Sequence, residues 1–110
     1  MRDRYGAIPI MITENGLGDK DPISATGEIL DAPRIDYLRE HLRACQRAID
    51  DGIPLFGYFV WSFIDLLSWL NGYQKQYGFV YVDHQHDLKR VKKQSYYWYQ
   101  QLMQSNGATL

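Results

Sequence analysis

A short apolar run that ends on a carboxylate constrains this chain more than any other feature. Residues 8–16 read Ile-Pro-Ile-Met-Ile-Thr-Glu-Asn-Gly. The apolar stretch, bounded by Pro9 and Gly16, predicts a strand that is buried on both faces, as in a parallel sheet. Glu14 stands at the carboxyl end of that strand, where α/β barrels place catalytic groups. Glu14 is therefore a candidate catalytic residue, and the alternative is a strand-end carboxylate that is merely exposed to water.

An amphipathic helix is predicted after this strand. Asp31 can cap its start, Pro33 fits its first turn, and Gly52 ends it. We interpret Cys45 as a packing residue because it belongs to the apolar stripe of the helix, and we expect the charged residues, Arg34 among them, to face solvent. The stripe recurs at three- and four-residue steps and consists of Ile35, Leu38, Leu42, Cys45 and Ile49.

A second buried strand is predicted at residues 55–63, which are rich in aromatic and apolar side chains. The order strand, helix, strand implies a parallel pair. Two polar, turn-rich segments, residues 17–31 and 64–78, follow the two strands and should lie at the same end of the sheet. Loops this long are often functional. An extended run at 79–83 follows, and a last helix should begin near residues 92–95.

Composition excludes several classes of function. The net charge is −1, so no excess of positive charge favours nucleic acid or a membrane surface as a partner. One cysteine cannot form an internal disulfide framework or a cysteine-based zinc site. The aromatic share of 15% fits a tight core or a stacking surface for a sugar ring. The apolar run near the start is too short for a signal peptide or a membrane span, which predicts a soluble, cytoplasmic protein.

Three ligand-binding patterns are incomplete in this sequence. Residues 16–18 resemble the start of a dinucleotide-binding loop, but Asp21 occupies the place of its third glycine. Asp19 and Asp21 suggest a calcium loop, yet Leu30 stands where that loop needs Glu. Residues 83–87 contain two histidines, and we interpret them as an exposed turn. We therefore expect no cofactor and no metal.

Several motifs together resemble family 1 of the glycoside hydrolases, the β-glucosidase and phospho-β-glycosidase family. Residues 12–16, Ile-Thr-Glu-Asn-Gly, resemble its nucleophile motif, and residues 57–62 resemble its final barrel strand. Residues 72–83 are similar to the segment after that strand, and the paired lysines Lys92 and Lys93 with residues 97–99 are similar to the terminal helix. The similarity covers residues 4–104, nearly the whole chain.

The resemblance implies the α/β class and a (β/α)8 TIM barrel, of which residues 1–110 form one partial domain. Only the seventh and eighth βα units, at the C-terminal end of the barrel, are present. Retaining hydrolysis needs two carboxyl groups roughly 5–5.5 Å apart, and the resemblance makes Glu14 the nucleophile. The family's acid/base glutamate belongs to an Asn-Glu-Pro motif that this sequence lacks. We therefore expect the chain alone to be inactive.

The resemblance also implies a substrate class. Relatives that act on plain sugars usually carry Glu at the position of Ser68. Such a carboxylate would repel a sugar phosphate by about 4 kcal/mol at ~4 Å and an effective dielectric near 20. Ser68, Lys75 and Tyr77 match the phosphate-binding set of the 6-phospho-β-glycosidases, and Trp61 and Trp69 would form apolar walls around the sugar. The expected substrate is a phosphorylated β-disaccharide or an aryl β-glucoside.

Two alternatives remain open at this level. The first is a 6-phospho-β-galactosidase: Trp69 lies close to the discriminating 4-hydroxyl in relatives and is frequent in galacto enzymes. Residues 69–75 look more like a phospho-glucosidase subgroup, so we favour glucosides. The second alternative is a non-catalytic, truncated remnant. Two βα units leave open sheet edges and an uncovered apolar face, which favour self-association.

Overall fold

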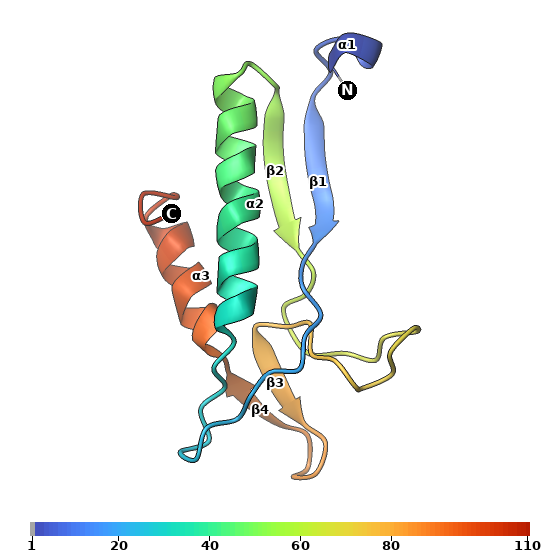
Figure 1. Cartoon of the computed structure of the whole chain (residues 1–110), viewed down its shortest axis with the longest axis vertical. Coiled ribbons are helices and arrows are strands. Elements are labelled where there is room, and N and C mark those ends of the chain that lie inside the picture. Colours follow the sequence, from blue (N-terminus) through green and yellow to red (C-terminus); the bar gives the residue numbers. More distant parts are fainter. Residues whose placement is uncertain (1) are drawn as a thin grey trace.

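Two parallel strands connected by a long helix form the frame of the structure. The computed structural model describes residues 2–110. Strands β1 (Ile10–Asn15) and β2 (Leu55–Val60) run parallel and pair from their first residues to their last. Helix α2 (Ala32–Asp50) connects them and lies along the pair (Figure 1). The parallel strands and connecting helix expected from the sequence are confirmed, although β2 ends at Val60 and not at residue 63.

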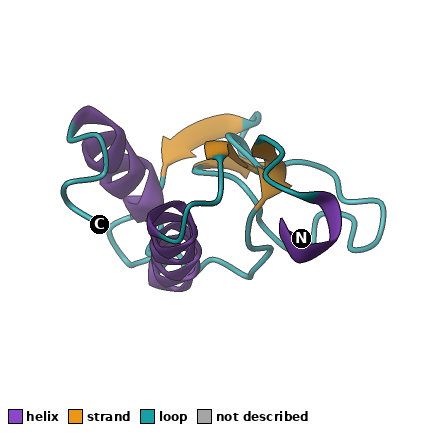
Figure 2. Cartoon of the chain, turned by 90° about the horizontal axis from the view of Figure 1, so that it is seen from above, coloured by secondary structure: helices purple, strands orange, loops and turns teal. Residues whose placement is uncertain are grey.

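A short first helix and a hairpin lie at the two ends of this frame, and the last helix lies beside α2. Helix α1 (Arg2–Tyr5) precedes β1. Strands β3 (Val80–Asp83) and β4 (Lys89–Lys92) form a separate antiparallel hairpin, and helix α3 (Gln94–Gln104) follows it. Seen from above, α2 and α3 lie side by side next to the strands (Figure 2). The molecule measures 50 × 32 × 17 Å and is therefore flat and elongated.

The core is small and lies mainly between the helices and the hairpin. Its most buried apolar side chain is Leu38 of α2, which is completely enclosed. Phe79 stacks on Tyr99 of α3, with ring centroids 4.8 Å apart. Other buried apolar side chains are Ile29, Ile35, Val80, Val82 and Leu102. Helix α3 is thus packed against α2 and against Phe79, the residue that precedes β3, as expected for an amphipathic helix.

One expectation about α2 is wrong. Arg34 does not face solvent, because it is 1% exposed and pairs with two aspartates. Asp31 occupies the N-cap position, but its side chain makes no capping hydrogen bond. Its carboxylate accepts hydrogen bonds from Ser95 at the start of α3 and from Arg34. A group that could cap one helix therefore links the starts of two helices.

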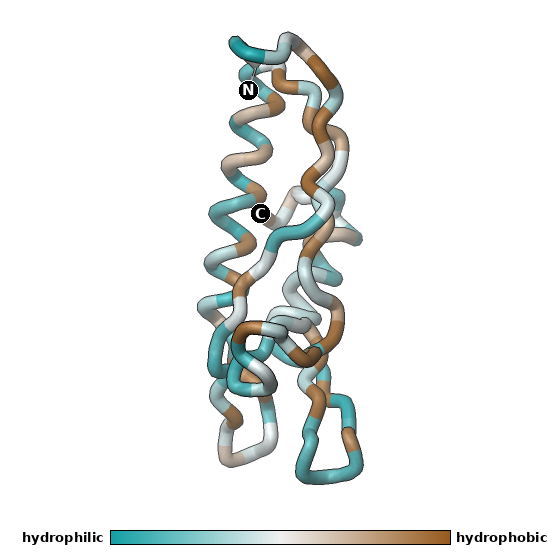
Figure 3. Tube along the Cα trace, turned by 90° about the vertical axis from the view of Figure 1, so that its right-hand side faces the viewer, coloured by the Kyte–Doolittle hydropathy of each residue, from teal (hydrophilic) through white to brown (hydrophobic). Residues whose placement is uncertain are grey.

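The strand pair leaves large apolar side chains uncovered. Phe56 is 68% exposed and Phe59 58% exposed, and Met11 of β1 is also exposed. Figure 3 shows hydrophobic residues recurring along both strands and at intervals on α2. A face of this kind is unusual for a complete soluble domain, and it is consistent with a sheet that is part of a larger one.

Candidate active site

The carboxyl ends of β1 and β2 are held together by two hydrogen bonds to Asn15 and approach each other closely at Gly16. The Trp61 N–H donates to the Asn15 carbonyl oxygen at 2.8 Å, and the Tyr58 hydroxyl donates to Asn15 Oδ1 at 2.6 Å. A Cβ atom at Gly16 would lie 1.8 Å from the Trp61 carbonyl oxygen. Gly16 is therefore required by the close approach of two backbones, whereas Asn15 supplies the two hydrogen-bond acceptors. Glu14 is placed next to the segment that begins at Trp61.

A cleft of about 500 Å³ lies at these strand ends and collects five of the six candidate residues. It is lined by Glu14, Trp61, Leu66, Leu67, Ser68, Trp69, Leu70 and Tyr77. The Glu14 side chain is exposed, and among the described lining residues it alone carries a carboxylate. One carboxylate among aromatic and hydroxyl side chains is suited to a sugar ligand, because the rings offer apolar faces and the hydroxyls offer hydrogen bonds.

Two hydroxyl groups meet on one wall of the cleft. The Tyr77 hydroxyl donates to Ser68 Oγ at 3.4 Å and accepts a hydrogen bond from Asn71 Nδ2 at 2.8 Å. The first of these bonds is long and therefore weak, so the tyrosine hydrogen can turn to a better acceptor. Gly18 lies against the Tyr77 ring, since a Cβ there would be 2.3 Å from a ring carbon. The sequence analysis did not identify Asn71, although it is polar and lies in the predicted loop.

Lys75 lies apart from this cleft. Its side chain is exposed and lines a neighbouring cavity of about 470 Å³ together with Tyr73, Asp83 and His84. The structure thus brings Ser68 and Tyr77 together but does not bring Lys75 to them. His86 is paired with Asp83 at 2.7 Å at the hairpin turn. No group of three or more potential metal ligands was found within residues 2–110.

A buried ionic cluster lies behind the segment that carries Tyr77. It contains Arg34, Lys93 and three aspartates, Asp21, Asp31 and Asp65. Burial lowers the pKa of Arg34, but hydrogen bonds and negative charge from Asp21 and Asp31 raise it more, so its pKa lies above the ordinary value. The guanidinium is therefore charged. The sequence analysis missed this cluster, because its members are distant in sequence.

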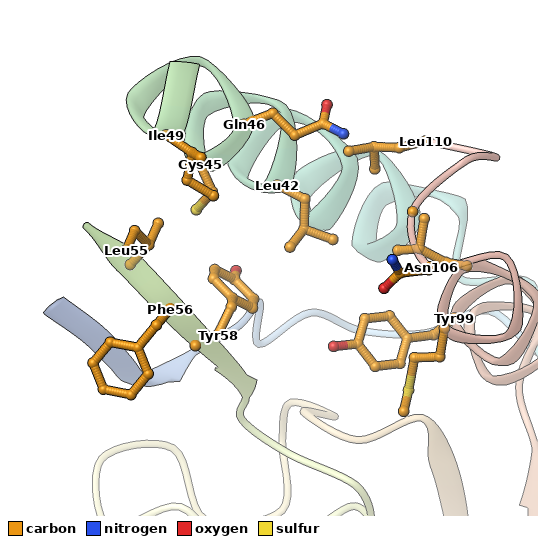
Figure 4. A pocket seen from close by; sticks show the side chains of 14 residues that line it. Leu42, Cys45, Gln46, Ile49, Leu55, Phe56, Tyr58, Tyr99, Asn106 and Leu110 are labelled. Atoms are coloured by element: carbon orange, nitrogen blue, oxygen red, sulfur yellow. The ribbon is translucent and has the colours of Figure 1, made fainter. Parts of the chain in front are cut away.

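A third cavity, of about 500 Å³, lies on the far side of β2, between α2 and α3 (Figure 4). Tyr58, Tyr99 and Cys45 line it among apolar side chains. Burial raises the pKa of the Cys45 thiol and of the Tyr58 hydroxyl. Both groups therefore stay protonated near neutral pH, and a protonated thiol is a poor nucleophile. We therefore assign no chemical role to the residues that line this cavity.

No helix within residues 2–110 is long and apolar enough to cross a membrane.

Comparison with known proteins identifies the family. Residues 1–108 match the family described as glycosyl hydrolase family 1. The aryl-phospho-β-D-glucosidase BglC of Bacillus subtilis is 57% identical over 107 residues, which cover 94% of this chain and 22% of that protein. A 6-phospho-β-galactosidase of Streptococcus equi subsp. zooepidemicus is 51% identical over 100 residues, covering 91% of this chain and 21% of that protein.

The structural comparison gives the same answer. The family 1 β-glucosidase of Thermotoga maritima superimposes with a TM-score of 0.90 at 43% identity, over 96% of this chain and 24% of that one. The chain spans about a quarter of the length of the relatives it matches. Such coverage confirms the partial barrel that the motifs predicted. The chain belongs to glycosyl hydrolase family 1 and forms part of that family's (β/α)8 barrel.

Proposed function

We propose that a complete barrel containing this chain hydrolyses 6-phospho-β-glucosides with retention of anomeric configuration. The observation that carries this proposal is a single cleft that combines one exposed carboxylate, Glu14, with two aromatic walls and a pair of hydroxyls at Ser68 and Tyr77. The aromatic walls are Trp61 and Trp69. These side chains can bind a phosphorylated sugar and attack its anomeric carbon. Retaining hydrolysis needs one further group, a second carboxyl group.

In the proposed mechanism, Glu14 is the nucleophile. One of its carboxylate oxygens attacks the anomeric carbon, and the bond from that carbon to the leaving oxygen breaks as the glycosyl–enzyme bond forms. The leaving oxygen takes a proton from an acid on the part of the barrel outside this chain. Water then attacks the anomeric carbon, the same outer group removes its proton, and Glu14 is released. Since the described cleft lining contains one carboxylate, the chain supplies half of this chemistry.

The proposed phosphate site rests on neutral hydroxyls. Ser68 carries no charge, so it does not repel a phosphate as a carboxylate would. The Tyr77 hydroxyl offers a hydrogen that its long bond to Ser68 holds only weakly. Asn71 offers an amide group that already contacts Tyr77. In this proposal the Lys75 ammonium group reaches the phosphate from the neighbouring cavity, because its side chain is long and flexible. We expect it to contribute less to phosphate binding than the hydroxyls.

The test uses a complete barrel in which residues 1–110 replace the matching quarter of the Bacillus subtilis relative. We expect Glu14→Ala to abolish hydrolysis of a chromogenic aryl 6-phospho-β-glucoside and added azide to restore turnover partly, because azide can replace the missing nucleophile. Undiminished turnover by Glu14→Ala without azide would contradict the nucleophile role. Glu28→Ala is the matched control, because Glu28 is an exposed glutamate that bonds only within its own turn.

The phosphate assignment has its own test in the same barrel. Ser68→Glu should raise the KM for the phosphorylated substrate at least tenfold, since the new carboxylate faces the phosphate. The KM for the unphosphorylated glucoside should not rise. Ser68→Gln is the matched control for size without charge. Equal effects of Ser68→Glu on both substrates would contradict the phosphate site.

A 6-phospho-β-galactosidase is the second candidate, and one observation favours it. The Streptococcus relative named as such is 51% identical to this chain. The two sugars differ at the 4-hydroxyl, and Trp69 is the cleft residue that we propose contacts it. Paired kinetics with the aryl 6-phospho-β-glucoside and 6-phospho-β-galactoside distinguish the candidates, and a higher kcat/KM for the galactoside would favour the second one.

A further inference from the structure

The peptide groups at Tyr77 and Gly78 are held by a side chain from the same loop. Asp65 Oδ1 accepts hydrogen bonds from the Tyr77 N–H at 3.2 Å and from the Gly78 N–H at 2.9 Å. The Tyr77 carbonyl oxygen accepts from the Ser62 N–H at 3.1 Å. The backbone that carries the Tyr77 hydroxyl is therefore fixed on both sides, and Asp65 makes two of these three bonds.

Asp65 is in turn held by a cation from a distant part of the chain. Lys93 Nζ donates to Asp65 Oδ1 at 2.7 Å. Lys93 is 0% exposed and stands directly before α3, twenty-eight residues away from Asp65. The Asp65 side chain is 7% exposed, so the pair is shielded from solvent and from salt. Charge-assisted bonds of this kind are short and directional.

The same lysine also binds the other long loop. Lys93 Nζ donates to Asp21 Oδ2 at 2.5 Å, and Asp21 accepts two bonds from Arg34 Nη1 at 2.9 and 3.0 Å. Arg34 Nη2 donates to the Gln76 carbonyl oxygen at 2.7 Å, immediately before Tyr77. Lys93 therefore connects the two loops that follow β1 and β2 through Asp21 and Asp65. Arg34, which shares Asp21 with Lys93, holds the carbonyl group that precedes Tyr77.

We propose that Lys93 is a positioning residue for the phosphate-binding hydroxyls. Its ammonium group fixes Asp65, and Asp65 fixes the peptide groups of Tyr77 and Gly78. These groups place the Tyr77 hydroxyl beside Ser68 in the cleft. The inference rests on the proposed function, because it assigns Lys93 a role in binding the phosphorylated substrate. Lys93 is completely buried and does not line the cleft, so it acts only through the loop.

The decisive variant is Lys93→Met in the complete barrel, since methionine keeps the unbranched chain up to the position of Cε and removes the ammonium group. We expect the KM for the aryl 6-phospho-β-glucoside to rise about tenfold, the effect of losing one well-placed hydrogen bond to a charged group. We expect kcat to stay within threefold and the KM for the unphosphorylated glucoside to stay within twofold. An equal change in both KM values, or no change in either, would overturn the inference.

A double-mutant cycle tests the route through Asp65. Asp65→Asn should raise the same KM in the same direction. If Lys93 acts through Asp65, Lys93→Met should add little in the Asp65→Asn background, because effects along one chain of contacts are not additive. Fully additive effects would overturn the inference. The double variant also removes one charge of each sign, so it remains testable if Lys93→Met fails to fold.

Two further variants serve as controls. The first separates a loss of stability from a displacement of the Tyr77 hydroxyl, and the second separates the positioning role of Lys93 from the proposed phosphate site. Leu38→Ala, in the enclosed core of α2, should lower the melting temperature and leave the ratio of the two KM values unchanged. Tyr77→Phe should raise the KM for the phosphorylated substrate if the proposed phosphate site is correct. A rise with Tyr77→Phe but none with Lys93→Met overturns the positioning role alone, whereas no rise with Tyr77→Phe refutes the phosphate site itself.

Discussion

Gly16→Ala tests whether the contact between two backbones places Glu14, the proposed nucleophile. The added Cβ would lie 1.8 Å from the Trp61 carbonyl oxygen and 2.9 Å from its carbonyl carbon. Cβ atoms essentially never come within 3.0 Å of another heavy atom, so the two segments must separate by more than an ångström. Both partners are backbone, and no flexible side chain can absorb the movement. Glu14 is two residues away and must move with β1.

The expected cost is mainly catalytic. A misplacement of about 1 Å can cost roughly 100-fold in rate, so we expect kcat of the complete barrel to fall by about that factor on phosphorylated and unphosphorylated substrates alike. Overpacking should also destabilise the fold by about 1–3 kcal/mol. The assay is steady-state hydrolysis of both aryl glucosides, combined with thermal melting of each variant.

Gly27→Ala is the matched control for this substitution. Gly27 has a φ of +82° and open space around its Cβ position, so alanine there costs about 1–2 kcal/mol of backbone strain without displacing a neighbour. The Gly27→Ala variant should have a lower melting temperature than the unsubstituted barrel but a similar kcat. The reasoning would be refuted if Gly16→Ala retained kcat within threefold while losing no more stability than Gly27→Ala.

Two other predictions follow from the sheet. Burial raises the pKa of Tyr58 above its ordinary value of 10, so the stability contributed by its proton is complete below pH 10 and is lost as the pH rises above it. The melting temperature of the complete barrel should therefore fall more steeply above pH 10 than that of Tyr58→Phe, and parallel curves would contradict this. The isolated chain, with Phe56 and Phe59 exposed on the sheet, should self-associate with increasing concentration in light scattering. A monodisperse monomer at all concentrations would contradict that expectation.

The parts of the fold that depend on local pattern could be predicted from the sequence. The apolar stripe of α2 and the two parallel strands follow directly from periodicity and length. The expected burial of both strand faces is not found within this chain, where every residue of β1 and β2 is half-buried or exposed. Strand β4 was missed, because its sequence Lys-Arg-Val-Lys carries little apolar signal and its identity comes from pairing with β3. Strand β2 stops early because the Ser62 N–H turns to the Tyr77 carbonyl oxygen and leaves the neighbouring strand.

The grouping of the candidate site residues could be predicted where it depends on strand ends, and less so where it depends on loop conformation. Five candidate residues line one cleft because parallel strands bring their carboxyl ends together. Lys75 lies in another cavity, because the path of a long loop decides which way a side chain points. Arg34 was misplaced for a related reason. A charged residue on a helix usually faces solvent. Arg34 is buried because it pairs with Asp21, which lies in a loop whose course could not be predicted from the sequence.

The buried ionic cluster also limits how this part of the barrel can be recombined with homologous sequences. Asp21 and Arg34 lie before residue 50, whereas Asp65 and Lys93 lie after residue 55. A crossover between α2 and β2 would take the two halves of the cluster from different parents. Any mismatch would leave a buried charge without its partner, which typically costs about 3–5 kcal/mol. Crossovers ahead of β1 keep the cluster intact, so residues 10–104 should be inherited as one block.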